Sequence, residues 1–295
     1  MTGLEHWEIS GGGYRAVVLE AGGGLGDVFH HDRRIVRGSK PSGAVSAGRG
    51  QVLAPWPNRI RDGRYDFAGV SYQLALSDPT HSHAIHGLLR WCAWRLDERA
   101  PDRVTVSCRL APQAGYPWPL HLRAEYAVDA DGLAVTLHAS NPGDERVPVA
   151  IGMHPYLDAG VPLDEATLLL PASARHRADG RLIPTGTEAV AGQNDFRVAR
   201  PMAGITLDDG FTGLERDDAG IATVELSGAH TVRLEVDPSW PHLQVFTGDE
   251  LPADPRMSLA VEPMSAPANA FNSGIDLVTL APGEEWSGSF RISAR

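Results

Sequence analysis

The segment Arg103-Val-Thr-Val-Ser-Cys-Arg-Leu110 alternates polar and apolar side chains along most of its length. Successive side chains of a β-strand point to opposite faces, so this pattern predicts a strand with one buried face. The same alternation recurs at residues 133–139 and 231–236. Further segments of this kind are residues 14–19, 121–128, 221–226 and 287–292. The dominant pattern of the chain is therefore that of β-structure.

Turn-forming pairs separate these segments. They are Asp62-Gly63, Asp131-Gly132, Asn141-Pro142-Gly143, Asp179-Gly180 and Pro282-Gly283. Such pairs are the residues that tight turns prefer. No stretch of about ten or more residues carries the apolar period of a helix, which is about 3.6 residues. The 32 glycines and 22 prolines are spread throughout the chain, as expected for many short strands joined by turns.

The composition is that of a globular protein, with 42% hydrophobic and 21% charged residues. Strands with one apolar face bury that face when two sheets stack. No linker of serine and glycine, no break in composition and no repeat of about 20–50 residues interrupts the chain. The sequence therefore predicts an all-β fold, a large antiparallel β sandwich, as a single domain over residues 1–295.

Charge and hydropathy exclude several classes of partner. The formal net charge is −11, and no stripe of cations suited to phosphate binding is present, which argues against nucleic acid. No apolar run reaches the ~18 residues that a membrane helix needs, and the first residues lack the features of a secretory signal. Cys92 and Cys108 have no metal-ligand spacing and are expected to be reduced thiols in apolar, strand-like segments. We therefore expect a cytoplasmic protein without a membrane partner.

Two segments carry basic side chains in unusual settings. Arg59, in Ala54-Pro-Trp-Pro-Asn-Arg-Ile60, is either a surface arginine packed on Trp56 or a forked donor for hydroxyls or an anion. Three histidines occur in the run His81-Ser-His-Ala-Ile-His86. A metal site is disfavoured, because Asp78 is the only nearby carboxylate and His86 does not share the strand face of the other two. The glycine after His86 suggests a close backbone approach, which slightly favours a substrate contact over the alternative of a core histidine.

Three further positions could carry acid–base chemistry. His154 precedes a proline, which favours an extended backbone, and histidine titrates near neutrality; a buried core histidine is the alternative. Asp208 belongs to an Asp-Asp-Gly sequence that is otherwise typical of a turn. Glu262 ends the apolar run Ser258-Leu-Ala-Val-Glu. Desolvation there would raise the basicity of its carboxylate, as a general base requires.

In combination and in order, these sites resemble the aldose 1-epimerase (galactose mutarotase-like) family over residues 11–292. The matching elements are Asn58-Arg-Ile60 with Asp62-Gly-Arg-Tyr65, His86-Gly87, His154-Pro-Tyr156, Asp208 with Phe211, Pro241-His-Leu-Gln-Val-Phe-Thr-Gly248, and Glu262. The resemblance implies a β supersandwich that acts on free sugars without a cofactor or a metal. By the family pattern Glu262 takes the proton of the anomeric hydroxyl and His154 protonates the ring oxygen.

The same resemblance implies that Arg59, His86 and Asp208 bind the sugar substrate. We expect a monomer or a weak dimer. Leu88 stands where the family usually has a second glycine, and Pro263-Met264 follow the glutamate, so the chain resembles an outlying branch. Arg59 and Arg90 could bind an anionic substituent, so a phosphorylated or sulfonated sugar is an alternative substrate. A carbohydrate-binding protein without activity is a further alternative, and a glycosidase would need Asp208 and Glu262 to flank one bond.

Overall fold

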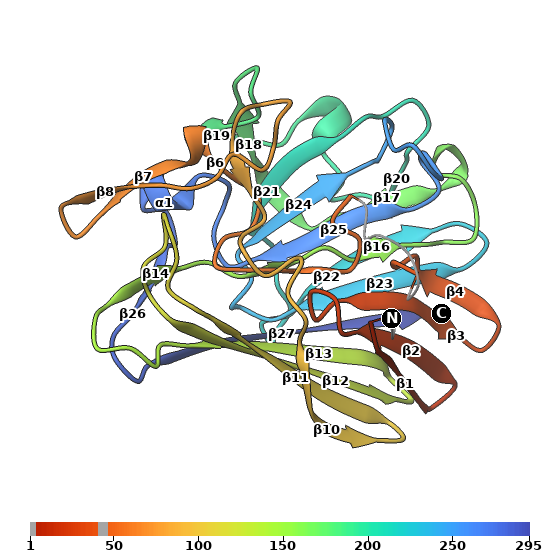
Figure 1. Ribbon diagram of the computed structural model, residues 1–295. Helices are drawn as coiled ribbons and strands as arrows, with labels where there is room; N and C mark the ends of the chain where they lie inside the picture. Colours follow the sequence, from red (N-terminus) through yellow and green to blue (C-terminus); the bar gives the residue numbers. More distant parts are fainter. Residues whose placement is uncertain (1–3, 41–46) are drawn as a thin grey trace.

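The computed structural model describes residues 4–40 and 47–295. Its architecture is a sandwich of two large sheets, and every pairing between its named strands is antiparallel, from the β1–β2 pair to the short β7–β8 hairpin (Figure 1). The described residues contain a single α-helix, α1 (Ala270–Ser273), and three short 3-10 turns. The all-β prediction is confirmed. No helix in the described part of the chain is long and apolar enough to cross a membrane.

The first sheet has twelve strands and carries the candidate site. They are β1 (His6–Gly11), β2 (Tyr14–Leu19), β3 (Leu25–His30), β4 (Arg33–Val36), β5 (Val52–Leu53), β15 (Gly152–Met153), β16 (Tyr156–Leu157), β18 (Ala172–Ala178), β19 (Pro184–Ala189), β21 (Asp208–Leu214), β24 (His242–Phe246) and β25 (Leu259–Met264).

The second sheet has nine strands. They are β10 (Arg95–Ala100), β11 (Arg103–Leu110), β12 (Leu120–Asp129), β13 (Gly132–Ser140), β17 (Thr167–Leu169), β20 (Arg200–Pro201), β22 (Ala222–Ser227), β23 (Thr231–Val236) and β27 (Glu285–Ala294). Three two-stranded pairs complete the fold: β6 (Arg59–Ile60) with β9 (Ala84–Ile85), β7 (Arg64–Phe67) with β8 (Val70–Gln73), and β14 (Val147–Val149) with β26 (Val278–Leu280).

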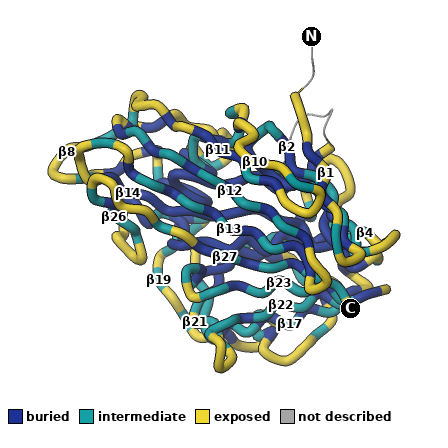
Figure 2. Tube along the Cα trace, turned by 90° about the horizontal axis from the view of Figure 1, so that it is seen from below, coloured by how far each residue is buried: buried dark blue, intermediate teal, exposed yellow. Residues whose placement is uncertain are grey.

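The alternation in the sequence corresponds to alternating burial in the second sheet. Along β12 and β13 almost every second residue is buried, and the residues between them are half-buried (Figure 2). The buried side chains of β11, such as Val104 and Val106, belong to the same core as Trp7 of β1. Because β1 and β2 pack on β12, the apolar faces of the two sheets bury each other.

The two cysteines differ from expectation in one respect. Both are free thiols, and Cys108 is buried on β11 as predicted. Cys92 is only half-buried and lies in a turn before β10, not in a strand. Its backbone N–H donates to the carbonyl of Leu89, which closes the turn, so the apolar residues around it do not form a strand.

Strand β25 is central to the first sheet, and all six of its residues are buried. It pairs with β24 on one side and with β15 and β16 on the other. Glu262 is its fourth residue, so the prediction that this glutamate ends a strand was wrong. A carboxylate in the middle of a fully buried strand must be paired or functional, because its charge is removed from water.

Candidate functional site

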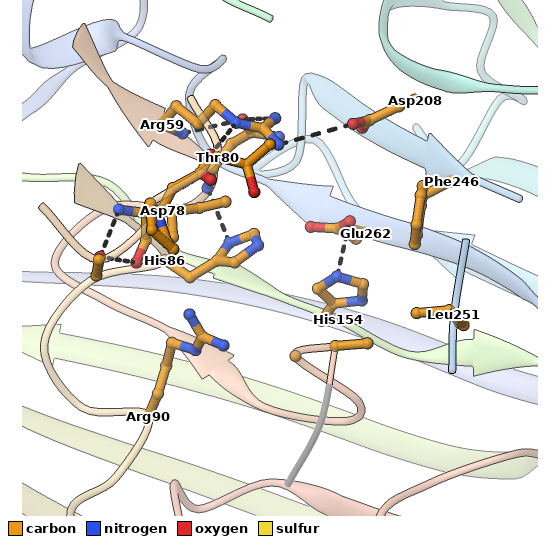
Figure 3. Close-up of a pocket in the computed structure, with 16 residues that line it drawn as sticks. Arg59, Asp78, Thr80, His86, Arg90, His154, Asp208, Phe246, Leu251 and Glu262 are labelled. Atoms are coloured by element: carbon orange, nitrogen blue, oxygen red, sulfur yellow. Dashed lines mark hydrogen bonds and ion pairs between the residues drawn. The ribbon is translucent and has the colours of Figure 1, made fainter. Parts of the chain in front are cut away.

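A cavity of about 430 Å³ opens over β25 and contains all five residues singled out by the sequence (Figure 3). They are Arg59, His86, His154, Asp208 and Glu262. Other lining residues are Ala47, Gly48, Asn58, Ser77, Asp78, Pro79, Thr80, Ile85, Arg90, Phe246 and Leu251. The residues that line the cavity therefore come from segments that are separated by more than half of the sequence.

The sheet brings His154 and Glu262 together. Strands β15 and β16 both pair with β25, and His154 lies between them. Its Nε2 atom is 3.2 Å from Oε1 of Glu262, and the two residues are only 4% and 2% exposed. The backbone N–H of Val261 donates to the carbonyl of Pro155, which ties the histidine segment to the glutamate strand. The two side chains therefore form a buried acid–base pair.

The backbone of residues 48–51 fixes the position of the His154 backbone through two hydrogen bonds. The N–H of His154 donates to the carbonyl of Gln51, and the N–H of Gly50 donates to the carbonyl of His154. A Cβ atom on Gly48 would lie 2.6 Å from Cδ2 of His154, so only a glycine allows this close approach. The ring of Tyr156 stacks on the imidazole at 4.9 Å with an angle of 6° between the planes.

Burial drives both members of the pair towards their neutral forms. It raises the pKa of Glu262 well above the usual value, with a further contribution from the charge of Asp208. It lowers the pKa of His154 to about 3, and the positive charge of Arg90 acts in the same direction. Within the described residues, Oε2 of Glu262 and Nδ1 of His154 are buried without a hydrogen-bond partner. The pair therefore holds one proton over a wide pH range, and Oε2 has a free lone pair.

His86 is held as a hydrogen-bond donor. Its Nδ1 accepts the backbone N–H of Asn58 at 3.1 Å, and an N–H can only donate. The proton of the neutral ring must therefore be on Nε2. Burial, followed by the neighbouring His154, lowers the pKa of His86 well below its usual value, so the ring stays neutral. The rings of His86 and His154 meet edge to face at 5.4 Å.

Arg59 and Asp208 form the other wall of the cavity. Arg59 is 9% exposed and donates through Nε to Oδ2 of Asp78 at 2.9 Å, so the interpretation as a surface arginine was wrong. Its terminal nitrogen is 3.8 Å from Oδ2 of Asp208. Gln244, which lies opposite Glu262 in the β24–β25 register, donates to the other oxygen of Asp208 at 2.6 Å. Gln244 was missed as a site residue; the available signal is a polar residue between the apolar Leu243 and Val245.

Arg90 faces the cavity from the turn that follows β9 (Figure 3). Gln51 fixes it twice: Nε of Arg90 donates to Oε1 of Gln51, and Nε2 of Gln51 donates to the carbonyl of Arg90. No carboxylate of the residues that the structure describes lies within ion-pair distance of Arg90. Burial lowers the pKa of its guanidinium, and the Glu262 carboxyl partly offsets this effect.

The donor chemistry fits hydroxyl groups better than a metal ion. His86, His154 and Glu262 each offer an atom within 4.8 Å of the others, which is the nearest approach to a metal site in the described residues. A metal ligand needs a free lone pair, but Nδ1 of His86 is occupied and Nε2 carries a proton. His81 contacts Asp78 at 3.0 Å instead. His83 accepts the backbone N–H of Asp62.

Comparisons with known proteins give one consistent family. The family model described as aldose 1-epimerase matches residues 5–293. Uncharacterized protein YihR of Escherichia coli K12 is 36% identical over 287 residues, covering 96% of this chain and 91% of its own length. Uncharacterized protein YphB of the same organism is 25% identical over 295 residues, covering 97% of each chain.

Solved structures share the fold. A putative aldose 1-epimerase from Escherichia coli K12 superposes with a TM-score of 0.86 at 22% identity, covering 99% of both chains. The galactose 1-epimerase of Lactobacillus acidophilus superposes with a TM-score of 0.83 at 21% identity, covering 99% of this chain and 94% of its own. At these identities the likeness concerns the fold of the sandwich.

Proposed function

Because the chain belongs to the aldose 1-epimerase family, we propose that it is an isomerase that interconverts the α and β anomers of a free hexose. The observation that carries this proposal is the contact of 3.2 Å between Nε2 of His154 and Oε1 of Glu262 at the base of the cavity. A ring-opening reaction at one carbon needs one group to remove a proton and another to supply one. A buried pair that shares a single proton meets that need.

The steps follow from the two places where this proton can lie. With the proton on His154, the carboxylate of Glu262 takes the proton of the anomeric hydroxyl and the imidazolium gives its proton to the ring oxygen. The bond between C1 and the ring oxygen breaks, and C1 becomes an aldehyde. The aldehyde group turns about the C1–C2 bond, and the reverse proton transfers close the ring on the other face. No net proton is gained or lost.

The pair rests in its neutral form, with the proton on Glu262, because burial raises the pKa of Glu262 and lowers that of His154. Ring opening therefore begins with transfer of this proton from Glu262 to His154 across their direct contact. Ring opening then leaves Glu262 protonated and His154 neutral, so the step ends in the form that burial stabilises.

The remaining residues would hold the sugar hydroxyls. Nε2–H of His86 is a fixed donor, and Asp208 is an acceptor that Gln244 keeps in place. Arg59, anchored on Asp78, presents further N–H groups to the same space. The test is to measure anomer exchange on fresh α-glucose and α-galactose by polarimetry and by exchange NMR. Acceleration by the protein is expected; no acceleration on any hexose or charged hexose would overturn the proposal.

The pH dependence should differ from that of an ordinary histidine. His154 is faced by Glu262, His86, Tyr156, Arg90 and Arg49, and burial with the two arginines lowers its pKa to about 3 from the usual 6.5. The pair therefore keeps a single proton as the pH falls through 6.5, and it gains a second one only near pH 3. We expect kcat/KM at about pH 5 to stay within roughly twofold of that at about pH 7. An acid limb near 6.5 in the kcat/KM profile would contradict this.

Arg90 favours a second candidate substrate, a hexose with an anionic group such as a 6-phosphate or a sulfonate. Its guanidinium lines the cavity, and no carboxylate of residues 4–40 or 47–295 is within ion-pair distance of it. Arg59 is different, because Asp78 already binds it. A charge-assisted hydrogen bond to such a group is worth about 1.5–3 kcal/mol, or roughly 10- to 150-fold in kcat/KM.

The two substrates are distinguished by an Arg90→Met variant. If the substrate is anionic, the variant should lose roughly 10-fold or more in kcat/KM for a hexose 6-phosphate or a sulfonated hexose and change less than about threefold for glucose. Exchange NMR measures both sugars under the same conditions. A wild-type protein that turns over glucose faster than either charged sugar would exclude the second candidate.

A further inference from the structure

A buried arginine lies behind the acid–base pair, outside the cavity. Arg49 is 8% exposed, and its guanidinium carbon lies 4.4 Å from the ring centroid of Tyr156. The ring of Tyr156 in turn stacks on His154, nearly parallel to it. Arginine, tyrosine and histidine therefore form a continuous stack that ends at the atom in contact with Glu262.

The stack is anchored to the backbone at both rings. The hydroxyl of Tyr156 donates to the carbonyl of Ala47 at 2.9 Å. Arg49 and His154 are joined by the backbone between them, since Gly50, next to Arg49, donates to the carbonyl of His154. Tyr156 is fully buried, so its ring cannot leave the stack without disturbing the core.

Arg49 has little other reason to be buried. Its polar contact to a side chain is one hydrogen bond of 3.4 Å to the hydroxyl of Ser258. None of the carboxylates in the described residues forms an ion pair with it. Burial lowers the pKa of its guanidinium, and Asp254 and Asp27 offset this only in part. Burying an arginine without a carboxylate is costly, and a cation–π contact offsets only part of the cost. Such an arrangement suggests a role in the site.

From this geometry we propose that Arg49 is a positioning residue for the acid–base pair. Through the ring of Tyr156 it holds the plane of the His154 imidazole, and it places a buried positive charge behind that ring. The proposal rests on the proposed function, because it assigns Arg49 to the same reaction. A positive charge at this place makes protonated His154 a stronger acid, which is the property that protonation of a ring oxygen requires. The lowered pKa of His154 has Arg49 among its causes.

The first test needs no sugar. The titration of the His154 ring is followed by proton–nitrogen NMR of histidine side chains, with a His154→Gln variant to assign the signal. His154 is faced by Glu262, His86, Arg90, Tyr156 and Arg49, and the first four are left unchanged. Arg49→Met should move the protonation of His154 upward by about one pH unit, and Arg49→Lys should restore most of the difference. Arg33→Met, at an exposed arginine of β4, is the control for a lost surface charge.

The second test is kinetic. In Arg49→Met the acid limb of the kcat/KM profile should move upward and kcat should fall about tenfold, with KM changed less than twofold. Tyr156→Leu removes the link in the stack while Arg49 stays, and it should lower kcat by a similar factor. This variant tests the proposal if Arg49→Met fails to fold. A folded Arg49→Met with the wild-type titration, acid limb and kcat would overturn the proposal. If no sugar is turned over, the proposed function fails, while the NMR titration still decides whether Arg49 acts on His154.

Discussion

A Glu262→Gln variant is expected to lose about 10²- to 10⁴-fold in kcat for anomer exchange. The amide keeps the size of the side chain and an oxygen that can accept a hydrogen bond, but it can no longer take the proton of the anomeric hydroxyl. Exchange NMR at saturating sugar measures the loss. His154→Ala should cause a loss of similar size, and the double variant should be little worse, because residues that act as a unit are not additive.

The fold should survive this change. At neutral pH the unfolded chain has an ionised Glu262, whereas burial raises the pKa of this group in the folded protein. A raised carboxyl pKa costs stability above the usual pKa, so removing the acid should leave the melting temperature unchanged or higher. Glu235→Gln on β23 of the other sheet is the matched control and should keep full activity. A folded Glu262→Gln variant within about threefold of the wild-type rate would contradict the role of this residue.

Gly87→Ala is expected to lower the free energy of unfolding by more than about 3 kcal/mol. Gly87 has a φ of +71°, and a Cβ atom there would lie 2.0 Å from the carbonyl oxygen of Ala54. That oxygen accepts the N–H of Leu88, so the clash would break a backbone contact beside His86. Because His86 itself has a φ of 60°, its ring position depends on this backbone, and activity should fall as well.

A second glycine distinguishes the cost of a positive φ from the cost of a steric clash. Gly69 has a similar φ of +80°, but no atom lies within 4 Å of where its Cβ would be. Gly69→Ala should therefore cost only about 1 kcal/mol, the conformational part alone. Denaturant unfolding of both variants gives the comparison. Equal losses would show that the Ala54 contact does not determine the cost at Gly87.

The strands were predictable because a strand with one buried face alternates apolar and polar residues in the sequence. The predicted segments 103–110 and 231–236 coincide with β11 and β23. The short strands around the site carry no such period. Strand β25 is buried on both faces, so its apolar run did not show that Glu262 lies inside the strand.

The sequence singled out five residues that line one cavity, but it did not show their contacts. The order of the motifs identified His154 and Glu262, yet their environment comes from residues distant in sequence. Gln244 and Gln51 hold Asp208 and Arg90 by hydrogen bonds across 36 and 39 residues. Gln51 has no local pattern that marks it, and Gln244 is marked only as a polar residue between two apolar ones. Whether the His81–His86 run can bind a metal depends on which atom each ring nitrogen contacts, and the sequence does not give those contacts.

The placement of the pair, with Glu262 on β25 and His154 between β15 and β16, has a consequence for how this protein can diversify. Side chains alternate along a strand, so an insertion or a deletion of one residue in β25 would turn Glu262 to the opposite face. The rest of the cavity wall comes largely from connecting segments, including those that carry Thr80, Arg90 and Leu251. Loops accept changes in length and composition that strands do not. Under the proposed function, the preference for a sugar can therefore change through the connecting segments while the acid–base pair on the sheet stays in place.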